Sequence, residues 1–178
     1  MTAGRVIVLN GTSSSGKTSL GRALQDRLDG TWLLLGIDTF ITALPWKLYG
    51  TPDGHTINDD GTIDFGDAWH AERSRWRAAV GSLARSGSNL LLDEVFTEGA
   101  VDQSRWAEAL AGIDVTWVGV HVDVEVAATR EQARGDRNIG MARQQALVVH
   151  EGVRYDVEVD STSAAPEELA AQLQLALS

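Results

Sequence analysis

Val6-Ile-Val-Leu-Asn-Gly-Thr-Ser-Ser-Ser-Gly-Lys-Thr18 is the stretch of sequence that decides the fold. Its first four residues are apolar and uncharged, which is typical of a strand buried on both faces of a parallel sheet. Residues 11–18 satisfy the pattern G-x-x-x-x-G-K-[ST]. Beyond it, apolar or small residues recur at helical spacing as far as Leu28, and Gly30 follows as a stop signal. The sequence therefore predicts a strand, a glycine-rich loop and a helix in direct succession.

The loop at residues 11–18 has the pattern of a phosphate-binding loop. Its backbone N–H groups can surround phosphate oxygens, its lysine can reach the β- and γ-phosphates, and the hydroxyl after the lysine can bind Mg²⁺. An ordinary Gly/Ser loop is the alternative, but a chance match between a strand and a helix is rare. We expect Lys17 to act in catalysis and ATP to be bound by Gly11, Ser13, Ser14, Ser15, Gly16, Lys17, Thr18 and Ser19.

The composition predicts one globular domain over residues 1–178. Hydrophobic residues make up 43% and charged residues 22%, as in ordinary soluble proteins. The formal net charge of −10 opposes attraction to nucleic acid and to anionic membranes, so neither is an expected partner. The chain has no cysteine and no apolar run long enough for a signal sequence or membrane helix. We expect a cytoplasmic protein, and homo-oligomer formation is left open.

Apolar runs alternate with helical patterns along the rest of the chain. Strands are expected at residues 32–35, 90–92, 115–122 and 157–159, and helices at about 67–86, 102–110, 124–134 and from 166 onward. This order predicts an α/β fold of the three-layer P-loop NTPase type, with a parallel sheet of about five strands and helices on both faces. Ligands of such sheets bind beyond the carboxyl ends of the strands. An irregular segment at about 45–66 is expected to be a substrate-binding insertion, and the segment at about 130–145 a lid.

A second nucleotide signal is Leu90-Leu-Leu-Asp93, an apolar strand that ends in a carboxylate. Such a carboxylate organises Mg²⁺ in P-loop folds. An aspartate at a strand end can also serve only as a turn or cap residue, but the phosphate-binding loop favours the metal role. We therefore expect Thr18 and Asp93 to hold Mg²⁺. Glu94 should point to the opposite face, because side chains alternate along a strand.

Asp38 is the candidate general base. It follows the strand expected at residues 32–35, so it should lie at the same edge of the sheet as the phosphate-binding loop. A carboxylate there can accept the proton of an acceptor hydroxyl and orient that hydroxyl for attack. The alternative is that Asp38 only caps a helix that begins at Thr39.

Arg130, Arg134 and Arg137 are spaced to lie on one helical face. Phosphoryl transfer spreads charge over three oxygens, which favours cationic side chains beyond the single lysine. We expect Arg130 to bind the nucleotide and Arg134 and Arg137 to act in catalysis. The alternative is that these arginines lie on a solvent-exposed helix face and pair with Glu131 and Asp136.

Aromatic residues gather near the expected edge and in the insertion above it, which indicates an acceptor with apolar surface. The small-molecule acceptor, which must carry a hydroxyl, is expected to contact Asp38, Phe40, Trp46, Trp69 and Phe96. For Trp46 and Trp69, a place in the core is an equally good interpretation.

Several blocks of the chain together resemble the chloramphenicol phosphotransferase family. They are the phosphate-binding loop, L-L-L-G-I-D-T-F, L-L-L-D-E-V-F, A-R-G-D-R and V-V-H-E-G-V-R-Y-D-V-E-V-D. The resemblance implies a P-loop kinase with a fold like that of the nucleoside monophosphate kinases. It further implies that Asp38 accepts the proton, that Lys17 and Thr18 bind phosphate and Mg²⁺, and that Arg134 and Arg137 are lid arginines. Glu94 departs from the family pattern, and the segment at residues 46–67 looks different.

The expected activity is ATP-dependent phosphorylation of a hydroxyl on a small, largely apolar molecule, with chloramphenicol or a similar antibiotic first in line. A kinase of a metabolite such as shikimate, a sugar acid or a nucleoside is the runner-up. Such acceptors favour arginines in the insertion, and residues 45–66 contain none. An NTP-binding regulatory module without an acceptor is a third, weaker interpretation.

Overall fold

The computed structural model describes residues 2–134 and 140–177, without the side chain of Arg134. Its main sheet has five strands in the order β2-β5-β1-β6-β7. They are β1 (Arg5–Asn10), β2 (Trp32–Gly36), β5 (Asn89–Glu94), β6 (Asp114–His121) and β7 (Val157–Asp160). Each pairing between these strands is parallel. The prediction of a parallel sheet of about five strands is confirmed.

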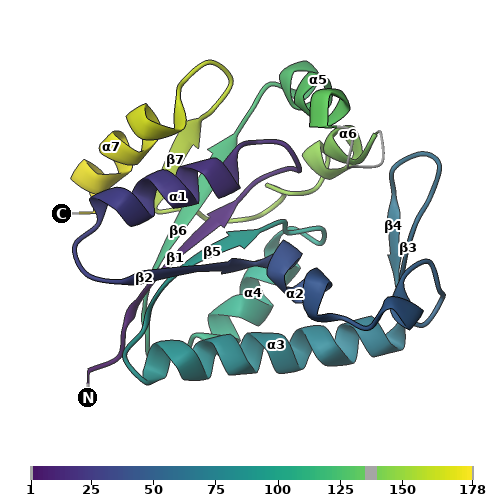
Figure 1. Ribbon diagram of the computed structural model, residues 1–178, viewed down its shortest axis with the longest axis horizontal. Helices are drawn as coiled ribbons and strands as arrows, with labels where there is room; N and C mark the ends of the chain where they lie inside the picture. Colours follow the sequence, from purple (N-terminus) through teal and green to yellow (C-terminus); the bar gives the residue numbers. More distant parts are fainter. Residues whose placement is uncertain (1, 135–139, 178) are drawn as a thin grey trace.

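Helices cover both faces of this sheet (Figure 1). One layer contains α1 (Lys17–Arg27) and α7 (Pro166–Ala176), and the opposite layer contains α3 (Asp67–Arg85) and α4 (Ala100–Ala109). Successive residues of β1 point to opposite faces. Ile7 and Leu9 therefore join the core under α1 and α7, while Val6 and Val8 join the core under α3. This is why the apolar run of β1 has no polar interruption.

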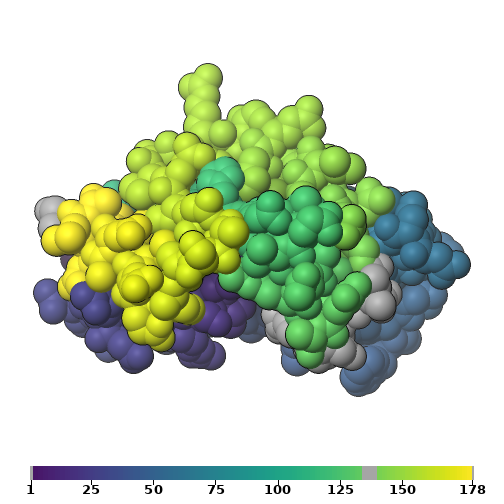
Figure 2. Space-filling model, turned by 90° about the horizontal axis from the view of Figure 1, so that it is seen from above, coloured from purple at the N-terminus to yellow at the C-terminus, as the bar shows by residue number. Residues whose placement is uncertain are grey.

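The segment after β2 forms a small unit beyond the carboxyl edge of the sheet. It consists of α2 (Ile37–Ala43), a 3₁₀ turn (Trp46–Leu48) and the antiparallel hairpin of β3 (His55–Ile57) and β4 (Ile63–Phe65). A separate apolar cluster around Phe40, Leu44 and Trp69 joins this unit to α3. The hairpin stands at one end of the molecule, away from the C-terminal helix (Figures 1 and 2).

On the face shown in Figure 2, α5 (Val124–Arg134) lies between α7 and the hairpin segment. The short helix α6 (Met141–Ala146) packs against α5. Within the part of the chain that the structure describes, the helices are too short or too polar to traverse a bilayer.

Candidate active site

The predicted succession of strand, loop and helix is confirmed by β1, the connection after it and α1. Gly16 has φ +85°, a left-handed conformation that glycine adopts without strain. Gly11 is needed for a different reason, because a Cβ there would lie 2.4 Å from the carbonyl oxygen of Val120. The loop can therefore press against β6 only with glycine at position 11. Ser13, Ser14, Gly16, Lys17, Thr18 and Ser19 line a cavity at this edge of the sheet.

Lys17 and Thr18 both lie close to Asp93, at the end of β5. The Thr18 hydroxyl donates a 2.5 Å hydrogen bond to Asp93 Oδ2, and Lys17 Nζ is 3.9 Å from Asp93 Oδ1. Lys17 Nζ also donates to the carbonyl oxygen of Thr12 at 2.7 Å. Glu94 points the other way and is buried, as the alternation of a strand predicts.

The loop has the features that a nucleotide phosphate and its metal ion require. The hydroxyl groups of Thr12 and Ser14 are buried and have no hydrogen-bond partner among the described residues. Apart from Gly16 and its chain neighbours, none of the described residues has an atom within 4 Å of the place where a Cβ of Gly16 would be. The oxygens of Thr18 and Asp93 are ligands of the kind that Mg²⁺ prefers. These residues therefore fit a magnesium–phosphate group.

Asp38 reaches the same cavity through a close approach of β2 to β5. Gly36 pairs with Asp93 in the sheet, and a Cβ on Gly36 would lie 2.1 Å from the Asp93 carbonyl oxygen. The helix α2 begins directly at Ile37, earlier than the expected start at Thr39, so Asp38 lies in its first turn. The capping position belongs to Gly36, which leaves the Asp38 side chain to line the cavity.

The cavity has a volume of about 390 Å³, within the range of roughly 300–1,000 Å³ that is usual for small-molecule sites. Its wall opposite the phosphate-binding loop is largely apolar and comes from α2, the hairpin segment and α3. The residues of this wall are Ile37, Ile41, Tyr49, Ile57, Ile63, Phe65 and Trp69. The sequence pattern indicated this apolar character and a substrate-binding insertion at about 45–66, the segment that supplies Tyr49, Ile57, Ile63 and Phe65. It did not single out Ile37 and Ile41 of α2.

Of the four aromatic residues expected to contact an acceptor, Trp69 lines the cavity. Phe40 is buried behind it, with ring centroids 5.1 Å apart in an edge-on arrangement. Phe96 is 1% exposed and belongs to the core under α3 and α4. Trp46 is 84% exposed and packs on Tyr49 outside the cavity. Phe40, Trp46 and Phe96 therefore do not line the cavity, because packing with neighbouring side chains takes them elsewhere.

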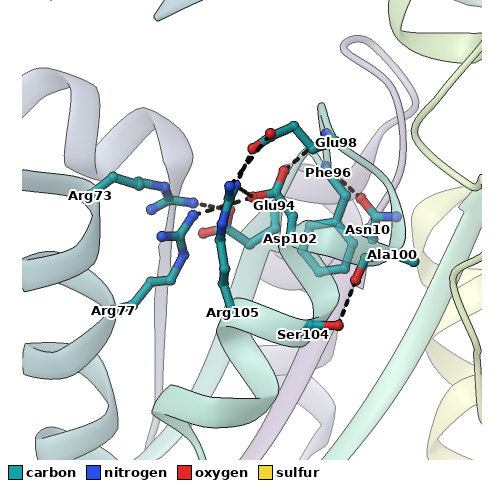
Figure 3. Close-up of polar contacts among 10 residues, drawn as sticks. All are labelled: Asn10, Arg73, Arg77, Glu94, Phe96, Glu98, Ala100, Asp102, Ser104 and Arg105. Carbon is teal, nitrogen blue, oxygen red and sulfur yellow. Dashed lines mark hydrogen bonds and ion pairs between the residues drawn. The ribbon is translucent and has the colours of Figure 1, made fainter. Parts of the chain in front are cut away.

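Sequence reasoning missed a polar wall of the cavity that α3 and α4 provide (Figure 3). Arg77 donates to Asp102 at 3.2 Å, and Arg105 contacts both Asp102, at 3.2 Å, and Glu98. Arg73 pairs with the buried Glu94. Burial raises the pKa of Glu94 to about 7, against the opposing effect of Arg73. The spacing of Arg73 and Arg77, four residues apart on a predicted helix, was the available signal.

The expected arginine clamp is only partly within the described residues. Arg130 donates to the carbonyl oxygens of Ser161 and Thr162, at 2.9 and 3.2 Å. The side chain of Arg134 and the whole of Arg137 lie outside the described residues. Glu131 does not form a solvated face, because it is buried and accepts hydrogen bonds from backbone N–H groups at the start of α6.

A hydrogen-bonded network supports the loop from behind. The side-chain amide of Asn10 donates to the Tyr155 hydroxyl at 2.6 Å, and Asn10 Oδ1 accepts from the Phe96 N–H at 2.9 Å. The Tyr155 hydroxyl is also 2.6 Å from Nδ1 of His150, whose ring stacks on His121. Burial first, and then the charge of His121, lowers the pKa of His150 to about 4. The network thus joins the end of β1 to the segments after β5 and α6.

A phosphate-binding loop on the first strand, a strand-end aspartate beside it and an adjoining acceptor-sized cavity define a P-loop kinase. Solved structures share this fold. A gluconokinase from Sinorhizobium meliloti 1021 matches with TM-score 0.65 at 18% identity, over 99% of this chain and 92% of that one. A shikimate kinase from Acinetobacter baumannii, solved with shikimate, matches with TM-score 0.63 at 19% identity, over 99% and 94%.

The chain belongs to the family described as chloramphenicol phosphotransferase-like protein, whose model matches residues 4–178. A Mycobacterium tuberculosis H37Rv protein named "Putative O-phosphotransferase Rv2636" is 37% identical over 193 residues, which cover 97% of this chain and 82% of the relative. The resemblance found in the sequence is therefore confirmed. Membership of this family makes the chain an enzyme that phosphorylates a hydroxyl group of a small molecule.

Proposed function

We propose that this enzyme transfers the γ-phosphoryl group of Mg-ATP to a hydroxyl of a small acceptor with a large apolar part. The observation that carries the proposal is one continuous cavity. The phosphate-binding loop, the Asp38 carboxylate and the apolar wall from the hairpin all line it. An acceptor that packs on the apolar wall would have its hydroxyl held between the carboxylate and the nucleotide.

In the proposed reaction, the acceptor oxygen forms a bond to the γ-phosphorus while the bond to the β–γ bridging oxygen breaks and ADP leaves. The hydroxyl proton passes to Asp38. Lys17 stabilises the charge on the phosphate oxygens, and Thr18 and Asp93 would hold Mg²⁺, which neutralises charge on the β- and γ-phosphates when bound. The family resemblance adds Arg134 and Arg137 as further cations for the transferring group.

The first acceptor to test is chloramphenicol or a similar antibiotic, in line with the family to which the chain belongs. Two features of the insertion at residues 45–66 support an acceptor with a flat apolar surface. Ile57 and Ile63 present aliphatic side chains to the cavity, and Phe65 stacks on Trp69 with ring centroids 4.7 Å apart. The proposal includes a cytoplasmic location, where ATP is available.

A kinase of an ordinary metabolite is the second candidate, because one observation favours it. The arginines that the insertion lacks are present in the cavity wall, where α3 supplies Arg73 and Arg77 and α4 supplies Arg105. A polar or anionic acceptor could bind there.

ATP consumption by the purified chain, measured with and without acceptor, tests the proposal. The acceptor panel contains chloramphenicol, nucleosides, shikimate and simple aryl alcohols, and phosphorylated product is identified by mass spectrometry. We expect ATP consumption to require an acceptor and to yield a phosphate monoester. Hydrolysis that is unchanged by every hydroxyl compound of the panel would contradict acceptor phosphorylation.

A further inference from the structure

We propose that the acceptor carries a carboxylate, which the guanidinium groups of Arg77 and Arg105 bind at the end of the cavity formed by α3 and α4. This inference rests on the proposed function and narrows its acceptor class. It departs from the family-based choice of chloramphenicol, a neutral alcohol, and selects a carboxylate-bearing alcohol as the preferred acceptor.

The first argument is that guanidinium donors in this wall are unused. Among the described residues, Nη1 of Arg73 and Nε of Arg77 are buried without a hydrogen-bond acceptor, and Oε1 of Glu94, the partner of Arg73, is buried without a donor. The Arg73 side chain is 6% exposed and that of Arg77 is 11% exposed. Buried donors without partners are rare in folded proteins and unfavourable. The free oxygen of Glu94 belongs to the partner of Arg73, so Nε of Arg77 is the donor for which a further acceptor atom is expected. A ligand oxygen is an atom of that kind.

The second argument is the local charge. Three guanidinium groups line this end of the cavity, and the carboxylates that line it with them are Glu98 and Asp102. Glu94 lies behind the wall, and its pKa of about 7 leaves its negative charge incomplete near neutral pH. Burial lowers the pKa of Arg77, and the neighbouring charge of Arg73 adds to this effect. An added anion counteracts the repulsion between these two cations.

The third argument is access and geometry. Figure 3 shows the guanidinium groups of Arg73, Arg77 and Arg105 directed toward one another from two helices. A second hollow beside α3 and α4 shares Arg77, Glu98 and Arg105 with the first, so space adjoins these groups on both sides. The planar guanidinium fork matches a carboxylate through two parallel hydrogen bonds. Arg105 is 37% exposed and its partner Glu98 is 44% exposed, so both side chains are accessible to a ligand.

The test compares two alcohols of equal shape and different charge, 4-(hydroxymethyl)benzoate and 4-nitrobenzyl alcohol. Analogues with one or two methylene groups between ring and carboxylate allow for the unknown length of the acceptor. Dissociation constants are measured by calorimetry on the full chain saturated with a non-hydrolysable ATP analogue. We expect at least one carboxylate to bind roughly tenfold more tightly than its neutral counterpart, the usual value of a charged hydrogen bond.

Three variants separate a binding role from a structural one. Arg105→Gln should weaken carboxylate binding roughly tenfold and leave binding of the nitro compound nearly unchanged. Glu98→Gln should tighten carboxylate binding, because Glu98 competes for Arg105. Arg75→Gln is the matched control, since Arg75 lies on α3 between the two cavity arginines and is 69% exposed outside the cavity.

Equal binding of acid and neutral compound, failure of every carboxylate to bind, or equal loss of both ligands in Arg105→Gln would overturn the inference. If Arg105→Gln does not fold, the test rests on Glu98→Gln, for which tighter carboxylate binding is expected. Acceptor-dependent ATP consumption with neutral alcohols alone would contradict the carboxylate inference and support the proposed function. Carboxylate binding without phosphorylation of any alcohol would instead count against the proposed function.

Discussion

Thr18 and Asp93 are 75 positions apart in the chain, yet the hydroxyl of one donates a 2.5 Å hydrogen bond to the carboxylate of the other. The contact joins the first turn of α1 to the end of β5. It follows from the pairing of β1 with β5, in which Leu9 lies opposite Asp93. The two oxygens of this pair are thereby set where a metal ion bound to nucleotide phosphate is expected.

Asp93→Asn is predicted to lower the affinity for Mg²⁺ while nucleotide without metal still binds. The amide keeps the size of the side chain but removes the charge, and the loss in metal affinity should be roughly 10–100-fold. Activity measured against Mg²⁺ concentration should therefore recover partly at high Mg²⁺. Asp114→Asn, at the start of β6 and exposed, is the control and should leave the magnesium dependence unchanged.

Lys17→Ala is predicted to reduce turnover by roughly 10²–10³-fold, the usual effect of removing a donor to developing charge. Lys17 is buried, but its ammonium group bonds to the loop itself, at Thr12, so the melting temperature should change little. Thermal unfolding and acceptor-dependent ATP consumption measure the two effects. Lys47→Ala, which replaces the other lysine of the chain, is the matched control. Near wild-type turnover in a folded Lys17→Ala enzyme would refute the assignment of the loop.

The fold could be predicted because its signals are local. The apolar run of β1 is continuous since Val6, Ile7, Val8 and Leu9 are all buried between two helical layers. The glycine pattern after it reports a backbone requirement, which is seen at Gly11 and Gly16. The start of α2 was predicted at Thr39, two residues too late, because Gly36 resembles a break in the chain. In the structure Gly36 is extended, with φ 173°, and the helix begins at the next residue.

The candidate site was less predictable because its walls depend on packing between distant segments. Phe40, Phe96 and Trp69 are all aromatic residues near the expected edge of the sheet. The rings of Phe40 and Phe96, however, fill the cores on either side of α3. Arg73 and Arg77 are polar positions on a long helix, which usually means a solvated face. They enter the cavity only because α4 packs beside α3 and brings Asp102 and Arg105 to them. No local pattern contains that contact.

His150→Gln is predicted to make stability less sensitive to acid. The pKa of His150 is lowered from 6.5 to about 4, mainly by burial, so the unfolded chain takes up this proton more readily than the folded one. The contribution of His150 is complete above pH 6.5 and is lost as the pH falls toward 4. Urea unfolding of both proteins at pH 8, 6 and 4.5 measures the difference.

The wild type should lose more unfolding free energy than the variant between pH 6 and 4.5. The offset between them at pH 8 reports the altered bond to Tyr155 and the lost stacking on His121. Some acid sensitivity should remain in the variant, because burial also lowers the pKa of His55. Identical pH profiles for the two proteins would show that His150 is not protected from protonation in the folded state.

The last prediction concerns Asp38, which lies in the first turn of α2 and lines the cavity. If its carboxylate accepts the hydroxyl proton, Asp38→Asn should lower kcat by roughly 10²–10⁴-fold with ATP binding intact. The same change removes a negative charge from a helix N-terminus, which costs stability by itself. Asp67→Asn is the matched control, since Asp67 lies in the first turn of α3 and does not line the cavity. Both variants should lose similar stability, and Asp38→Asn alone should lose turnover.

A loose transition state makes the carboxylate mainly an orienting group and moves the loss of kcat toward the lower figure. Retention of most acceptor-dependent turnover by Asp38→Asn would leave Asp38 with a helix-stabilising role only.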